Sequence, residues 1–147
     1  MHSSAFAYKG AGCLIIGESG TGKSRLLAEA LLNGAALIGD DRVALHAQGN
    51  QLIASPVPEL LGVVELRGFG LIKHTRIAHA HGIDLVVMLD PTADTRLPEP
   101  ETQEYCGISV PYLRLPPPPV LSAASLLLYL EAMQEGRSLP PDWHPLG

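Results

Sequence analysis

The sequence CLIIGESGTGKS, residues 13–24, decides the fold of this chain. Its first part is a short apolar run with two adjacent isoleucines, which favours a buried strand that ends at Gly17. Its second part matches the phosphate-binding pattern G-x-x-x-x-G-K-[ST]. From Lys23 onward, KSRLLAEALLNG places its leucines on one helical face, and Gly34 supplies the left-handed residue that ends a helix. A strand, a glycine-rich loop and a helix in this order predict an α/β fold with a P-loop nucleotide-binding domain.

The glycine-rich loop has a specific binding chemistry. Glycines allow backbone N–H groups to curl around phosphate oxygens, and the N-terminus of the following helix adds partial positive charge. Lys23 would reach the outer phosphates, and the Ser24 hydroxyl would bind Mg²⁺. The alternative is a glycine-rich turn that binds no nucleotide, which would leave the full match to the pattern unexplained. The predicted cofactors are therefore ATP and Mg²⁺, and the predicted binding residues are Gly17, Glu18, Ser19, Gly20, Thr21, Gly22, Lys23 and Ser24.

Length and composition fit one domain with a core of its own. The chain has 147 residues, and 46% of them are hydrophobic. Ten Lys+Arg against 15 Asp+Glu give a formal net charge of −5, which argues against broad attraction to nucleic acid or to an anionic membrane. The two cysteines imply no disulfide framework, and the apolar runs are too short to span a bilayer. These observations predict a cytoplasmic protein with its P-loop domain over residues 1–136 and a tail over 137–147.

The sequence after Gly34 predicts a central, mostly parallel sheet flanked by helices, with an added β-hairpin. Residues 35–39 and 83–89 are apolar runs of strand length. Residues 43–55 alternate in polarity around a Gly-Asn turn signal, which indicates the hairpin. The segment 63–72 is expected to be a strand that runs into a loop with glycine backbone angles.

The last third of the chain is expected to contribute one element to the core. Residues 91–119 are rich in proline and are predicted to be extended surface chain. Ser122 can cap a final helix over residues 121–135, which Gly136 would end.

Two adjacent carboxylates, Asp40 and Asp41, follow the predicted strand at 35–39. In a βαβ unit with parallel strands this position is the C-terminal end of a strand, where open α/β sheets bind ligands. One carboxylate can hold Mg²⁺ through water, and the other can accept the proton of an attacking hydroxyl. The alternative is that Asp40 only caps a turn.

Three ordered segments together resemble a known family, the catalytic domain of HPr kinase/phosphorylase. They are GESGTGKS at 17–24, GDDRV at 39–43 and VELRGFGLI at 64–72. The resemblance covers most of residues 2–115, and the short alphaproteobacterial form without an N-terminal domain looks closest. It implies an ATP- and Mg²⁺-dependent kinase that phosphorylates a serine of an HPr-like phosphocarrier protein. It also implies a phosphorylase that uses inorganic phosphate and releases pyrophosphate.

The resemblance implies a role for individual residues. Asp41 would be the base in phosphorylation and the acid in the reverse reaction. His2 and Arg96 fall where the family has a functional histidine and an active-site arginine, and Glu65 would complete the Mg²⁺ shell. Family members assemble into hexamers, which implies a homo-oligomer. The predicted catalytic residues are thus Asp41, Lys23, His2 and Arg96, and the predicted metal ligands are Ser24, Glu65 and Asp40.

Two functions of other classes stay open at this point. A P-loop kinase of a small metabolite would normally carry a lid domain with several arginines, and no such insertion is obvious. A non-catalytic nucleotide-binding regulator would not need a base beside the outer phosphate. The basic residues Lys73, His74 and Arg76 could dock an acidic face of a protein substrate, with a plain solvated loop as the alternative.

Overall fold

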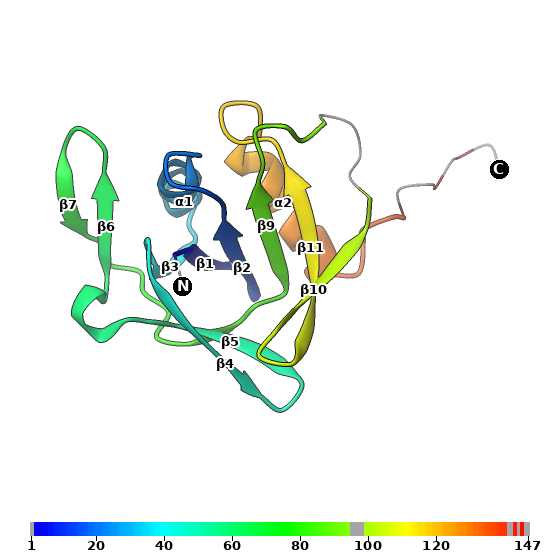
Figure 1. Ribbon diagram of the computed structural model, residues 1–147, viewed down its shortest axis with the longest axis horizontal. Helices are drawn as coiled ribbons and strands as arrows, with labels where there is room; N and C mark the ends of the chain where they lie inside the picture. Colours follow the sequence, from blue (N-terminus) through cyan, green and yellow to red (C-terminus); the bar gives the residue numbers. More distant parts are fainter. Residues whose placement is uncertain (1, 95–98, 141–142, 144, 146–147) are drawn as a thin grey trace.

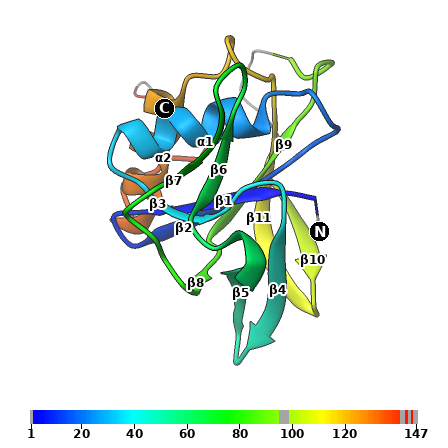
Figure 2. The same ribbon diagram turned by 90° about the vertical axis from the view of Figure 1, so that its left-hand side faces the viewer.

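A central sheet lies between two layers in the computed structural model, which describes residues 2–94, 99–140, 143 and 145. The helices α1 (Lys23–Leu32) and α2 (Ala123–Gln134) cover one face (Figures 1 and 2). A three-stranded sheet of β4 (Val43–Gln48), β5 (Gln51–Pro56) and β8 (His81–Gly82) covers the other. The strands of the central six-stranded sheet are, in spatial order, β10 (Glu101–Tyr105), β11 (Ile108–Leu115), β9 (Leu85–Leu89), β2 (Ala11–Ile16), β1 (Ser4–Tyr8) and β3 (Ala36–Gly39).

Alternating side chains of the central strands build two hydrophobic cores. Cys13 and Ile15 of β2 pack with Leu26 and Leu27 of α1, whereas Leu14 points to the opposite face and packs with the three-stranded sheet. This alternation is the period of two that an extended strand imposes. Burial raises the pKa of the Cys13 thiol, so this cysteine stays neutral and acts as a small apolar side chain.

The expected mostly parallel sheet is confirmed in the direction of its strands. β2, β9 and β11 pair in parallel, and β3 runs the same way, while β1 and β10 run against them. The sequence analysis did not identify β1, which lies between β2 and β3 and pairs with both. The strands on either side of α1 therefore point in one direction without being neighbours, and both helices cover the same face of the sheet.

The prediction for residues 91–119 is wrong where it excludes the segment from the core. β11 pairs in parallel with β9, and its Val110 and Tyr112 side chains are buried. Pro111 between them is exposed and lies opposite Thr102 of β10. The proline content suggested a loop, but the proline faces outward while its neighbours alternate inward, so tertiary packing outweighs the local preference.

Other predicted elements agree with the structure. The 43–55 hairpin forms as β4 and β5, and the Ser122 hydroxyl accepts the backbone N–H of Ser125 at 3.0 Å, as expected for the cap of α2.

The segment 63–72 differs from expectation, because it returns on itself as a hairpin of β6 (Val63–Leu66) and β7 (Gly70–Lys73). A short 3-10 helix, η1 (Pro58–Leu60), precedes it. Neither helix in the described part of the chain is long and apolar enough to cross a membrane.

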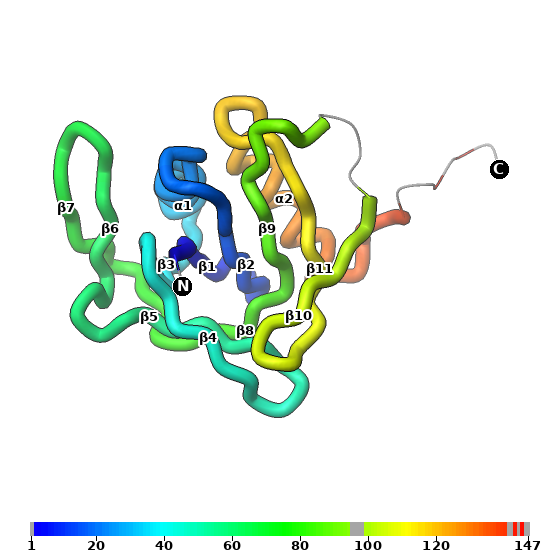
Figure 3. The backbone as a smooth tube through the Cα atoms, in the orientation of Figure 1, coloured from blue at the N-terminus to red at the C-terminus, as the bar shows by residue number. Residues whose placement is uncertain are grey.

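The backbone tube in Figure 3 shows the close layering of β2 and β8, and Gly12 lies at this contact. A Cβ atom at Gly12 would overlap the carbonyl oxygen of Gly82. We expect Gly12→Ala to lower the free energy of unfolding by about 2–3 kcal/mol, because backbone atoms of β8 would have to move. Urea denaturation would measure this change.

Gly82→Ala is the matched control, since its Cβ would meet only the flexible Gln51 side chain at 3.5 Å. The control should cost less than about 1 kcal/mol, as expected for an exchange without overlap. Equal stability of the two variants would show that the layers are not in tight contact.

Candidate active site

The glycine-rich loop, residues 17–22, joins β2 to the first turn of α1. Its backbone needs glycine, because Gly20 and Gly22 have φ angles of 83° and 104°. The Lys23 ammonium is folded over the loop and donates to the carbonyl oxygens of Gly17 at 2.7 Å and Glu18 at 2.9 Å. No side chain caps the start of α1, so its first N–H groups are presented to the loop. Such an arrangement suits an anion.

The Asp40 carboxylate accepts hydrogen bonds from three other elements around the site, and Asp40 is only 7% exposed. One oxygen, Oδ1, accepts the hydroxyls of Ser24 at 2.8 Å and Ser4 at 3.0 Å. The other, Oδ2, accepts the backbone N–H of Glu65 at 2.9 Å. Asp40 thus links β3 to β1, α1 and β6, whereas a turn cap would bind only its own neighbours in sequence.

Asp41 follows Asp40 in the sequence and, unlike Asp40, is exposed. Its φ of 67° is in the left-handed region, which aspartate tolerates better than most residues. The side chain is 65% exposed and borders the cleft at the glycine-rich loop. His2 Nδ1 lies 3.5 Å from Asp41 Oδ1, and the backbone N–H of Ser3 donates to the Asp41 carbonyl at 3.1 Å. The two residues before β1 therefore hold Asp41 in place.

A cleft of about 770 Å³ lies over the glycine-rich loop at the C-terminal ends of β2 and β3. Glu65 and Arg67 border it from the β6–β7 hairpin, and Pro118 closes it beside Gly22. The predicted residues that line the cleft are Ser19, Gly20, Thr21, Gly22, Lys23, Ser24, Asp41 and Glu65. Arg96 lies outside the residues that the structure describes.

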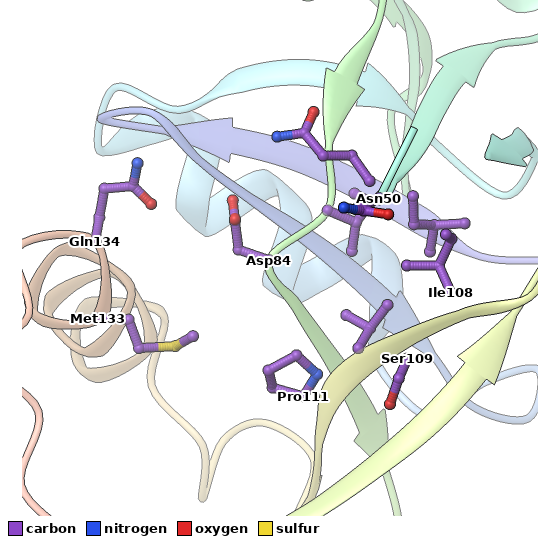
Figure 4. Close-up of a pocket in the computed structure, with 11 residues that line it drawn as sticks. Asn50, Asp84, Ile108, Ser109, Pro111, Met133 and Gln134 are labelled. Carbon is purple, nitrogen blue, oxygen red and sulfur yellow. The ribbon is translucent and has the colours of Figure 1, made fainter. Parts of the chain in front are cut away.

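A second hollow, of about 340 Å³, lies at the opposite edge of the central sheet (Figure 4). Asp84, which precedes β9, points to it and accepts the backbone N–H of Gly12 at 2.8 Å. Met133 and Gln134 reach it from the end of α2. Its described lining has no lysine, arginine or histidine, so it is poorly suited to phosphates.

The side-chain oxygen atoms of Asp40 and its neighbours fit a cation that prefers oxygen ligands, such as Mg²⁺. Two neighbouring ligands of octahedral Mg²⁺ lie about 2.9 Å apart, given metal–oxygen distances of about 2.0–2.1 Å. Ser24 Oγ and Asp40 Oδ1 are 2.8 Å apart, and the Glu65 carboxylate borders the same cleft. Among the described residues, no three His, Cys, Asp or Glu side chains lie close enough together to hold a metal ion by themselves. Mg²⁺ does not require one, because it takes one or two carboxylates together with water and phosphate oxygens.

Two residues near the loop were missed by the sequence analysis. Ser4 is fully buried and bridges the acidic pair, since it donates to Asp40 and lies 3.4 Å from the backbone N–H of Asp41. No sequence signal marks this serine. Asp90 directly follows the apolar strand β9, and a carboxylate after an apolar run is the same signal that marked Asp40. Hydrogen bonds from Thr92 hold the pKa of the Asp90 carboxyl below its usual range, and Asp90 is not among the described residues that border the cleft.

Comparisons with known proteins agree on one family. A family model described as the HPr Serine kinase C-terminal domain matches residues 1–135. The HPr kinase/phosphorylase of Levilactobacillus brevis is 33% identical over 135 residues, which cover 84% of this chain and 42% of that protein. The HPr kinase/phosphorylase of an Acidovorax species is 37% identical over 123 residues, which cover 75% of this chain and 39% of that protein. The chain thus spans about two fifths of the length of these relatives.

A solved structure, the Hpr(Ser) kinase/phosphatase from Coxiella burnetii, has the same fold. It aligns with a TM-score of 0.76 and 26% sequence identity, covering 92% of this chain and 88% of that one. The expected resemblance is confirmed by the family model, the relatives and this structure. The chain belongs to the HPr serine kinase C-terminal domain family.

Proposed function

We propose that this protein is an ATP- and Mg²⁺-dependent kinase that phosphorylates a serine of an HPr-like phosphocarrier protein. The observation that carries the proposal is the exposed Asp41 carboxylate, which borders the same cleft as the glycine-rich loop. The names of the relatives, HPr kinase/phosphorylase, support the substrate class. The proposed catalytic unit is residues 1–136, because α2 ends at Gln134, with residues 137–147 as a tail.

The glycine-rich loop would act as a P-loop that holds the phosphates of ATP. Lys23 would release the carbonyl oxygens of Gly17 and Glu18 and bind the outer phosphates instead. Ser24 and Asp40 would bind Mg²⁺, with Glu65 completing its shell. When bound, the metal ion would offset negative charge on the phosphates. These groups orient the reacting phosphate, which is most of what phosphoryl transfer requires of a protein.

Asp41 would be the general base. It would accept the proton of the substrate serine as the serine oxygen bonds to the outer phosphorus and the bond to ADP breaks. His2 lies close enough to orient the Asp41 carboxylate, and its part in catalysis stays a prediction. The role of Arg96 also stays a prediction, as does a hexameric assembly.

The same site supports the reverse reaction. Inorganic phosphate on the glycine-rich loop would attack the phosphorus of phosphoserine, forming the P–O–P bond of pyrophosphate and breaking the bond to the serine oxygen. Protonated Asp41 would return its proton to that oxygen. One residue then serves both directions, as microscopic reversibility requires.

Asp41→Asn separates a kinase from a nucleotide-binding regulator. Asparagine also tolerates the left-handed backbone of this position, so the variant should fold normally. We expect carrier phosphorylation, measured by intact-mass spectrometry, to fall roughly 10²- to 10⁴-fold while the affinity for Mg-ATP, measured by calorimetry, is kept. Glu104→Gln on the exposed strand β10 is the control and should change neither quantity. Full turnover in Asp41→Asn would exclude Asp41 as the base.

Ser4→Ala tests whether the buried serine sets the geometry of Asp40. The variant removes one of the two hydroxyl donors to Oδ1, so Asp40 should be less well positioned for the metal. We expect the Mg²⁺ concentration for half-maximal phosphorylation to rise about tenfold, because supporting hydrogen bonds typically contribute this much to metal affinity. Ser109→Ala, at an exposed site on β11, is the control. An unchanged Mg²⁺ dependence would assign Ser4 to folding alone.

A further inference from the structure

The β6–β7 hairpin exposes large apolar side chains beside the cleft. Phe69, Leu71 and Ile72 are 89%, 71% and 43% exposed, and we call Phe69 and Leu71 the hairpin patch. Phe69 also borders the cleft over the glycine-rich loop. Figures 1 and 2 show the hairpin standing away from the central sheet, beside α1. Leu71 pairs with exposed Glu65, whereas Ile72 pairs with buried Val64 and so lies on the opposite face of the hairpin. Large apolar side chains exposed beside a cleft mark interaction sites more often than singly scattered ones do.

The hairpin patch has a basic frame in an otherwise acidic protein. Exposed Arg67 precedes it and exposed Lys73 follows it. Residues 66–83 contain no aspartate or glutamate, although the whole chain has a formal net charge of −5. Arg76 in the same segment is already engaged, since it donates to the Gly34 carbonyl. Arg67 and Lys73 therefore supply positive charge beside the patch, while Glu65, which pairs with Leu71 across the hairpin, is the acidic residue nearest to it.

The hairpin is attached to the core under α1 and to the Asp40 carboxylate. Val64 of β6 is buried in the core under α1, and the backbone N–H of Glu65 donates to Asp40. The turn is tight, because the Phe69 N–H donates to the Leu66 carbonyl at 2.9 Å and Gly68 and Gly70 have φ angles of 88° and 106°. A macromolecule bound to the patch would thus be held in a defined position relative to the acidic pair.

We propose that the hairpin patch docks the protein substrate. Its chemistry selects a substrate face with apolar side chains near the acceptor serine and carboxylates around them, which would meet Arg67 and Lys73. The inference rests on the proposed kinase function and adds to it the surface that distinguishes a protein substrate from a small metabolite. Apolar contacts would supply most of the affinity, and the basic frame would orient the substrate.

The test is steady-state kinetics of carrier phosphorylation with Leu71→Ser and Lys73→Glu. Neither residue borders the cleft, so the affinity for Mg-ATP should not change. We expect each variant to raise KM for the carrier about tenfold, with kcat within about twofold of the original. Lys73→Glu should also weaken the salt dependence of kcat/KM. Leu128→Ser and Arg137→Glu, both exposed on or after α2, are the matched controls and should leave KM unchanged.

The outcomes separate the two proposals. Phosphorylation with an unchanged KM in both hairpin variants would overturn the docking surface and leave the kinase in place. A change in sedimentation coefficient with an unchanged KM would assign the hairpin patch to a second copy of the chain, and it would also overturn the inference. No phosphorylation of any phosphocarrier protein by the unmodified chain would overturn the proposed function and the docking surface together.

Discussion

The buried Asp40 carboxylate is the interaction on which the rest of the site depends. Its hydrogen bonds reach Ser4 of β1, Ser24 of α1 and the backbone of Glu65 on β6, so one side chain fixes three elements around the end of β3. A buried carboxylate is costly unless its oxygens are hydrogen-bonded, and here both oxygens are. Because buried Asp40 requires hydrogen-bond partners from β1, α1 and β6, folding of the sheet and assembly of the cleft are coupled.

Adjacent aspartates in this site have different surroundings and hence different capabilities. Asp40 is enclosed and already bonded, which suits a group that holds a metal and orients a serine. Asp41 is exposed, has a left-handed backbone and borders the cleft, which suits a group that exchanges a proton with a substrate. An alternating strand would have separated the two side chains to opposite faces. The turn after β3 instead leaves Asp40 buried and Asp41 exposed at the cleft.

Local sequence patterns predicted the parts of the fold that depend on local physics. The apolar run at 13–16, the glycine-rich loop and the cap at Ser122 each specify their structure within a few residues, and all three agree with the structure. The insertion of β1 between β2 and β3 and the burial of β11 depend on pairing between distant segments, which periodicity does not reveal. Ser4 was missed for the same reason, because its importance arises only when β1 lies beside Asp40.

The position of β1 has a practical consequence for how the protein is handled. Because His2 lies beside Asp41, a peptide joined in front of it would emerge at the rim of the cleft. An affinity tag rich in histidine placed there would compete for the proposed metal ion and obstruct the proposed docking of a protein substrate. The far end of α2 offers a better attachment point, since it lies on the other side of the molecule from the β6–β7 hairpin (Figure 1).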